Sequence, residues 1–390
     1  MTIEVLVDRG RTSIARSVFV SLLENSVVNQ RVPFQDALVA GRIHFSELVE
    51  LARRAEIPYS LFFAPQTVVD AQLATKTKKL LQGVSPTTFT VSSRSQVALR
   101  DVELIIKDLL RKQSLLKQQD KSLTRNTLVG LLKKSLGSIE QEANAVLAAL
   151  ELDRSEIRQA STGEAALERI IARLERKQVL VSRSVRGFMP QLIEVHFSGM
   201  TVRDPKVPYI FLAGGDHLDA QEPVGRQIFT LVLMAVLVAR GVFAPVTYDA
   251  QSTAPGAQRE YDIVGEILMP LAELRGIDFS SLAAVKEAAR EFKVTPSAVT
   301  VRGLRAGRLS QDMASVHLTA LETEFRQRPK SNARTPKPVN AVRKYCGNEL
   351  SLRLLAAVDA GTLSAREFCR VAALNHLKPA QLREFREALR

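Results

Sequence analysis

The sequence predicts an α+β fold that is mostly α-helical. Apolar residues recur at helical spacing along much of the chain, whereas short strand-like segments are confined to residues 178–213. The longest apolar stretch, from Ile228 to Ala239, falls well short of the ~20 residues that a helix needs to span a bilayer. We therefore interpret this stretch as a buried helix and expect no membrane partner.

Composition and charge narrow the class of protein. The chain has 390 residues, enough for two or three domains at roughly 150 residues each. Lys and Arg total 54 against 41 acidic residues, and the net charge of +13 favours polyanions or acidic partners. Cys346 and Cys369 lie far apart and outside any CxxC pair, as expected of reduced thiols. Residues 1–25 lack the pattern of a secretory signal, so we expect a cytoplasmic protein.

The N-terminal region contains one well-marked helix. Apolar residues recur at helical spacing between Phe45 and Ala55, Gly41 marks a turn before them, and Pro58 ends the helix. With residues 57–63, which follow the pattern iPxxxLF, this stretch resembles the closing part of an Xre-type helix-turn-helix domain. The preceding recognition helix is not evident in the sequence. We expect residues 1–92 to form a helical module with a partial Xre-like character.

A basic helical stretch is predicted at residues 94–134. It holds ten Lys or Arg residues against four acids, a difference of +6. The stretch has two interpretations: a solvated helical face, or a surface for phosphates or an acidic partner. No aromatic residue interleaves the charges, which argues against stacking on single-stranded nucleic acid. The candidate nucleic-acid-binding residues are Arg100, Lys107, Arg111, Lys112 and Lys117.

The middle of the chain is predicted to change from helix to strand. Residues 139–177 continue as helix, with an apolar face that includes Leu167 and Leu174. Three short strands are predicted after it, and a Gly-Gly turn closes the last of them. These predicted strands span residues 178–182, 193–197 and 208–213.

Helices are predicted for most of the remaining chain, apart from one basic segment. The segment from Arg326 to Lys344 carries seven basic residues, no acids and three prolines, so it predicts a mobile linker. Beyond it, Ser364 and Glu367 have the spacing of a capping box that opens a last pair of helices.

Several stretches follow one another in the order and spacing of a known family. They are Ser198–Ile210, Arg226–Leu231, Glu266–Pro270 and Val294–Ser310, with a helical tail at Gly347–Leu389. These stretches resemble, in turn, a strand pair, the RxxFTL opening of an active-site helix, the end of the next helix, a helix and turn, and a C-terminal module of the ImmA/IrrE family of zinc metallopeptidases.

The resemblance implies a zincin-like core with a small β-sheet, flanked by helical modules. We expect this core, active or inactive, at residues 161–325. The N-terminal module at residues 1–92 would connect to it through a basic helical segment at residues 93–160. A basic, proline-containing linker at residues 326–344 would lead to a C-terminal helical module at residues 345–390.

The chain lacks the histidines that hold zinc in this family. The family motif HExxH places two imidazoles on one helical face, where both reach a single metal ion, and its Glu activates the bound water. The corresponding segment here reads Leu233-Met234-Ala235-Val236-Leu237, so the three functional positions are Leu233, Met234 and Leu237. We therefore expect no zinc cofactor and no peptidase chemistry by the family's mechanism.

A metal site built from other residues is a weaker alternative. His217 stands with three carboxylates in the segment just before the active-site helix, and His217 and Asp219 are candidate ligands there. Glu260 falls in the region of the family's third ligand. The competing interpretation is a polar loop that caps the helix. His196, beside Phe197, is interpreted as a packed core residue.

Three functional hypotheses follow from the sequence. The first is a catalytically inactive ImmA/IrrE-like pseudo-peptidase that binds a protein partner. Because the family commonly cleaves Xre-like repressors or antitoxins of mobile elements, we expect a repressor, an antitoxin or a toxin-like component of a defence system. The second is a DNA-binding transcriptional regulator, based on the net charge, the basic helical stretch at residues 94–134 and the Xre-like segment. The third is a metallopeptidase with unconventional ligands.

Overall fold

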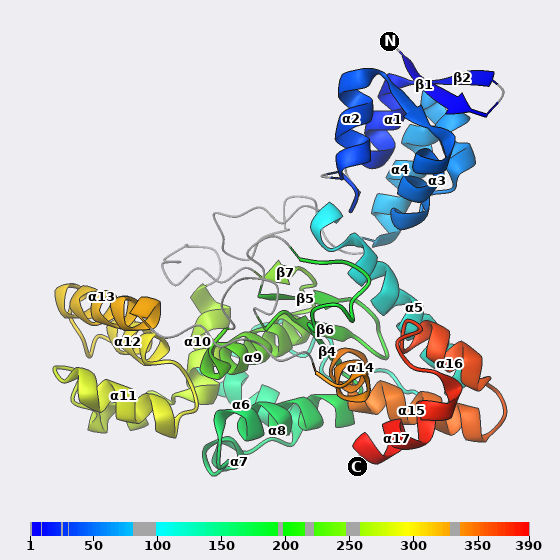
Figure 1. Cartoon of the computed structure of the whole chain (residues 1–390). Coiled ribbons are helices and arrows are strands. Elements are labelled where there is room, and N and C mark those ends of the chain that lie inside the picture. Colours follow the sequence, from blue (N-terminus) through cyan, green and yellow to red (C-terminus); the bar gives the residue numbers. More distant parts are fainter. Residues whose placement is uncertain are drawn as a thin grey trace. The chain divides into compact units, whose positions relative to one another are not determined.

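The computed structural model has an α+β fold, as predicted, with many helices and two small sheets (Figure 1). It divides into an N-terminal unit, Met1–Pro86 with Val97–Asp108, and a C-terminal unit, Thr87–Gln96 with Leu109–Arg390. Among the described residues, none of the helices has the length and apolar character needed to cross a membrane. The structure describes residues 2–8, 10–24, 26–29, 31–80, 99–193, 198–214, 222–246, 258–327 and 336–389.

The N-terminal unit contains a three-stranded sheet that the sequence analysis did not predict. Strand β1 (Thr2–Val7) pairs antiparallel with β2 (Gly10–Ala15) and parallel with β3 (Arg42–His44). Ile3 and Val5 of β1 are buried and the residues beside them are more exposed, which is the two-residue alternation of a strand with one covered face. The module predicted as helical over residues 1–92 therefore contains a small sheet beside its helices.

Helices cover the sheet of the N-terminal unit and enclose an aromatic core. The ring of Phe19 lies with its centroid 5.5 Å from that of Phe34 and 6.2 Å from that of Phe62. The predicted turn at Gly41 is confirmed, since its φ of 67° ends a helix in the left-handed conformation that glycine tolerates. The helices are α1 (Arg16–Leu23), α2 (Val32–Ala40), α3 (Phe45–Arg54) and α4 (Gln66–Leu80), with 3₁₀ turns η1 (Tyr59–Phe63) and η3 (Leu99–Asp101).

The predicted basic helix is shorter than expected. Helix α5 spans Glu103–Gln119 and contributes residues to both units, whereas residues 120–138 form turns. Asp120 accepts hydrogen bonds from the backbone and side chain of Ser122 at 2.9 and 2.6 Å, which favours a turn at this point. The helical prediction for residues 120–134 is therefore wrong.

The C-terminal unit is built around a four-stranded mixed sheet with the order β4-β6-β5-β7. Strand β4 is parallel to β6, whereas β5 is antiparallel to both β6 and β7. The strands predicted at residues 178–182 and 208–213 are confirmed, and most of the strand predicted at 193–197 lies outside the described residues. The strands are β4 (Leu180–Arg183), β5 (Gly199–Val202), β6 (Tyr209–Leu212) and β7 (Pro245–Val246).

Helix α9 (Val224–Arg240) is the central helix of the C-terminal unit. It contacts β5 and β6 of the sheet and packs against α8 and α10 (Figure 1). All residues from Thr230 to Ala239 are buried, so the predicted buried helix is confirmed. The helices around it are α6 (Ile139–Leu150), α7 (Arg154–Arg158), α8 (Gly163–Arg176) and α10 (Gln258–Leu268).

The remaining helices complete the C-terminal unit. Ser364 accepts a hydrogen bond from the N–H of Glu367 and caps α16, as the predicted capping residue should. These helices are α11 (Leu282–Glu291), α12 (Pro296–Arg305), α13 (Gln311–Gln327), α14 (Pro338–Cys346), α15 (Asn348–Asp359), α16 (Ala365–Val371) and α17 (Leu382–Ala388), with η5 (Glu273–Gly276) and η6 (Pro379–Gln381).

The predicted linker at residues 326–344 is helical at both of its described ends. Helix α13 continues to Gln327, and α14 begins at Pro338, where proline suits the first turn of a helix. Helix α14 packs against β4, and the Ser182 hydroxyl donates to the Tyr345 carbonyl at 2.5 Å. The end of the predicted linker is therefore a buried helix next to the sheet.

Glu175, near the end of α8, is a buried carboxyl at a junction of three elements. Its Oε2 accepts a hydrogen bond from the N–H of Glu349 in α15 at 3.2 Å. Burial raises the pKa of Glu175 to about 8, and the Glu349 carboxylate adds to this effect. The N–H groups of Glu349 and Val181 and the charge of Arg183 act in the opposite direction without overcoming it.

We expect Glu175→Gln to flatten part of the dependence of stability on pH. The native carboxyl keeps its proton above the ordinary pKa of 4.5, so its stabilising contribution is full below that value and is lost as the pH rises through about 8. As the pH rises from 4.5 to about 8, the Tm of the wild-type protein should fall relative to the Tm of the variant. Thermal unfolding over this pH range measures the difference. The matched change at an exposed acid, Glu384→Gln, should leave the wild-type profile. An unchanged slope in Glu175→Gln would contradict the assignment.

Candidate functional site

The candidate site is the middle of α9, where the resemblance places the active-site motif. Leu233 and Met234 are 0% exposed and Leu237 is 1% exposed. Met234 lies against β5, because a Cβ at Gly199 would come within 2.8 Å of its sulfur and terminal methyl. The three positions therefore form part of the apolar core, and neither leucine carries an atom that can bind a metal ion or transfer a proton.

The first turn of α9 is fixed by close backbone contact. A Cβ at Gly225 would lie 2.5 Å from the carbonyl carbon of Val294 and 2.7 Å from the nitrogen of Thr295. Only glycine allows the turn before α12 to approach α9 this closely. The helix is thus held at its N-terminal end by α12 and along its length by the sheet.

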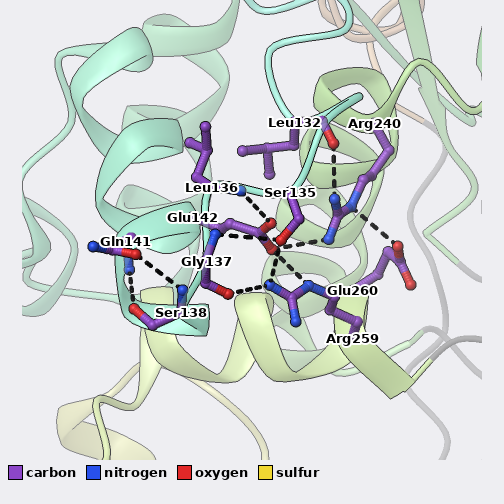
Figure 2. Close-up of polar contacts among 10 residues, drawn as sticks. All are labelled: Leu132, Ser135, Leu136, Gly137, Ser138, Gln141, Glu142, Arg240, Arg259 and Glu260. Atoms are coloured by element: carbon purple, nitrogen blue, oxygen red, sulfur yellow. Dashed lines mark hydrogen bonds and ion pairs between the residues drawn. The ribbon is translucent and has the colours of Figure 1, made fainter.

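The C-terminal end of α9 is held by a buried ionic cluster (Figure 2). Glu142 of α6 is 0% exposed and accepts hydrogen bonds from Arg240 Nη2 at 2.9 Å and Arg259 Nε at 3.0 Å. The N–H of Leu136 donates to the same carboxylate at 3.2 Å. Burial acts to raise the pKa of Glu142, but these hydrogen bonds and the charge of Arg240 hold it below its ordinary value.

Two guanidinium groups extend this cluster to the turn that precedes α6. Arg240 Nη1 donates to the Leu132 carbonyl at 2.7 Å, and Arg259 Nη2 reaches Ser135 Oγ at 3.0 Å and the Gly137 carbonyl at 2.7 Å (Figure 2). Planar guanidinium groups suit such multiple contacts because their donors point in fixed directions. The cluster therefore joins α6, α9, α10 and the segment at residues 132–137.

Glu260, the candidate third ligand, is a member of this cluster. Its Oε1 lies 3.2 Å from Nε of Arg240, so the group of α9 that faces this carboxylate is a guanidinium (Figure 2). The other two candidate ligands, His217 and Asp219, lie outside the described residues. Within the described residues, no group of three or more His, Cys, Asp or Glu side chains is arranged to hold a metal ion.

Glu222, just before α9, is a second carboxyl with a perturbed pKa. Burial raises the pKa of Glu222 to about 7, against the opposing charge of Arg226 and the hydroxyl of Ser198. The Ser198 hydroxyl donates to Glu222 Oε1 at 3.4 Å, and the Glu222 N–H donates to the Gly214 carbonyl at 3.0 Å. The sequence does not single out Glu222, because the environment of its side chain depends on tertiary packing.

The candidate nucleic-acid-binding residues on and near α5 do not form one exposed surface. Lys112 is 0% exposed and its ammonium lies 4.0 Å from the centroid of the Tyr345 ring, so the prediction of a phosphate contact there is wrong. Lys107 pairs with Glu103 at 2.7 Å. Lys117 pairs with the buried Asp204 at 2.5 Å.

The other two candidates lie in different units. Arg100 belongs to the N-terminal unit, where its Nε is 3.8 Å from the carboxylate of Asp101. Arg111 belongs to the C-terminal unit and is exposed. Lys112 is therefore buried, Lys107 and Lys117 are paired with carboxylates, and Arg100 and Arg111 belong to different units.

Comparison with protein-family models, curated proteins and solved structures finds no match to this chain.

We expect Leu233→Ala to destabilise the protein by ~2–5 kcal/mol, because it opens a cavity between α9 and its neighbours. Urea unfolding followed by circular dichroism measures the loss. Leu352→Ala is the matched control, since Leu352 is 48% exposed and leaves no cavity. Equal losses for the two variants would show that position 233 does not lie in a packed core.

Glu142→Ala should cost ~3–5 kcal/mol, because it leaves the Arg240 guanidinium without its buried partner. Glu322→Ala breaks an exposed ion pair with Arg326 and should cost only ~0–1 kcal/mol. The same unfolding measurement compares the two variants. A loss at Glu142 no larger than that at Glu322 would mean that the cluster does not hold the ends of these helices.

Proposed function

We propose that this chain is a catalytically inactive ImmA/IrrE-like pseudo-peptidase with a zincin-like core. In this proposal it acts as a regulatory or partner-binding protein of a mobile element, a toxin–antitoxin pair or a defence system. The observation that carries the proposal is the burial of Leu233, Met234 and Leu237 in α9, at the positions where the family motif places its two histidines and its glutamate.

Apolar side chains suit the buried positions 233, 234 and 237 if no zinc ion is bound there. Imidazole or carboxylate groups buried at these positions without a metal would lack partners, and each would cost free energy. Leucine and methionine avoid that cost and fill the space against β5 and β6. Glu260 is likewise neutralised by Arg240 instead of a metal ion. The packing of α9 therefore needs no metal ligands at these positions, which supports a role in binding rather than catalysis.

The two alternative functions have less support. A DNA-binding regulator that uses the predicted residues of α5 would need the ammonium groups of these lysines to be available to phosphates. Lys112 is buried, and Lys107 and Lys117 are paired with carboxylates. A metallopeptidase with unconventional ligands would need Glu260 free of Arg240. Both alternatives are kept as outcomes of the experiment below.

Metal analysis and partner capture on the same preparation test the proposal. We expect the full chain, purified without chelator and then incubated with zinc, to hold far less than one zinc ion per chain. Tagged protein should capture a repressor, antitoxin or toxin-like protein from its host and leave that protein uncleaved in the presence of zinc. Zinc near one per chain, or cleavage of the captured protein, would contradict an inactive protein. Capture of a defined DNA operator without a protein partner would favour the transcriptional regulator.

A further inference from the structure

A group of exposed cations in the C-terminal unit lies where two segments distant in sequence meet. Lys121 and Arg125 belong to the segment that follows α5, and Arg203 and Lys206 belong to the turn between β5 and β6. All four side chains are exposed, and within the described residues none of them pairs with a carboxylate. We call these four residues the basic patch.

Backbone and amide hydrogen bonds hold the two segments together. The N–H of Asn126 donates to the Pro205 carbonyl at 2.9 Å, so the positions next to Arg125 and Lys206 are in direct contact. The Asn126 side chain also donates to the Lys177 carbonyl at 2.7 Å. The side-chain amide of Gln178 donates to the Thr124 carbonyl at 2.9 Å and to the Lys206 carbonyl at 3.1 Å. The basic patch therefore stands on a fixed backbone.

The acidic residues near the basic patch are already engaged. Asp204 is buried, accepts hydrogen bonds from the N–H groups of Lys206 and Val207, and pairs with Lys117 at 2.5 Å. Asp120 pairs with Arg353 at 2.5 Å. Because these carboxylates are satisfied by other groups, the positive charge of the basic patch is left facing solvent.

We propose that the basic patch binds the phosphate backbone of a nucleic-acid duplex. The exposed residues between its cations are Ser122, Thr124 and Pro205. Their small or polar side chains let a phosphate group approach the cations. No large apolar side chain is exposed within residues 120–126 or 203–206, so these two segments do not themselves offer the hydrophobic anchor typical of a protein interface. No aromatic side chain lies in residues 120–126 or 203–206, which disfavours single strands.

Binding of this kind is independent of base sequence and depends on the protein's positive charge. The net charge of +13 provides a favourable long-range potential for a polyanion. Each phosphate contact releases condensed counterions, so the affinity should fall steeply with salt concentration. This surface does not depend on the pseudo-peptidase proposal, because α9 and its buried positions contribute nothing to it.

The test compares two variants of the full chain that lose the same charge. The patch variant carries Lys121→Gln, Arg125→Gln, Arg203→Gln and Lys206→Gln. The control variant replaces four exposed cations elsewhere in the C-terminal unit by Gln: Arg275, Arg308, Lys337 and Arg366. Fluorescence anisotropy with a short labelled DNA duplex measures affinity over a range of salt concentrations, and thermal unfolding confirms that both variants are folded.

We expect the patch variant to lose ~10-fold or more in affinity and to show a shallower salt slope, by about one unit per lost phosphate contact. The control variant should stay near wild type. A double change, Arg125→Gln with Lys206→Gln, should give an intermediate slope and keeps the test valid if the fourfold variant is unstable.

Three results would overturn the proposal. In the first, the patch and control variants lose duplex affinity equally, which would mean that net charge alone drives the binding. In the second, the wild-type protein does not bind the duplex even at low salt. In the third, polyglutamate binds the wild-type protein more tightly than the duplex does and loses its affinity in the patch variant, which would assign the surface to an acidic protein segment.

Discussion

The C-terminal unit depends on the burial of one apolar helix. Helix α9 contacts β5, β6, α8 and α10, and its buried stretch from Thr230 to Ala239 supplies a large share of the core. Packing of this density tolerates little change in side-chain volume, because interiors are filled as tightly as organic crystals. Close contacts at Gly199 and Gly225 then fix the distance and the orientation of the helix relative to the sheet and to α12.

An ion pair fixes the C-terminal end of the same helix. Glu142 and Arg240 lie 98 positions apart in sequence, and their contact ties α6 to the end of α9. Burying such charges costs solvation free energy, so the cluster is weak evidence for net stability and stronger evidence for a defined arrangement. The apolar middle of α9 supplies the free energy of packing, and its ionic end specifies which helices meet there.

Local sequence patterns predicted the elements whose signals are local. The helix at residues 45–55, the strands near residues 180 and 210, and the burial of α9 all follow from periodicity and turn residues. Strand β1 was missed because its alternation covers only six residues and no Asn-Gly or Asp-Gly turn marks the hairpin to β2. The pairing of Glu260 with Arg240 and the burial of Lys112 were also missed, since neither follows from spacing within one element.

Two carboxyls with raised pKa values, Glu175 and Glu222, leave the folded protein with more bound protons than its formal charge assumes. The formal charge of +13 counts every acid as ionised, yet burial raises the pKa of Glu175 to about 8 and that of Glu222 to about 7. Near neutrality, folding must therefore take up protons from the solvent at these two groups. The calorimetric enthalpy of unfolding at that pH will then contain the ionisation enthalpy of the buffer, and its value will differ between phosphate and Tris.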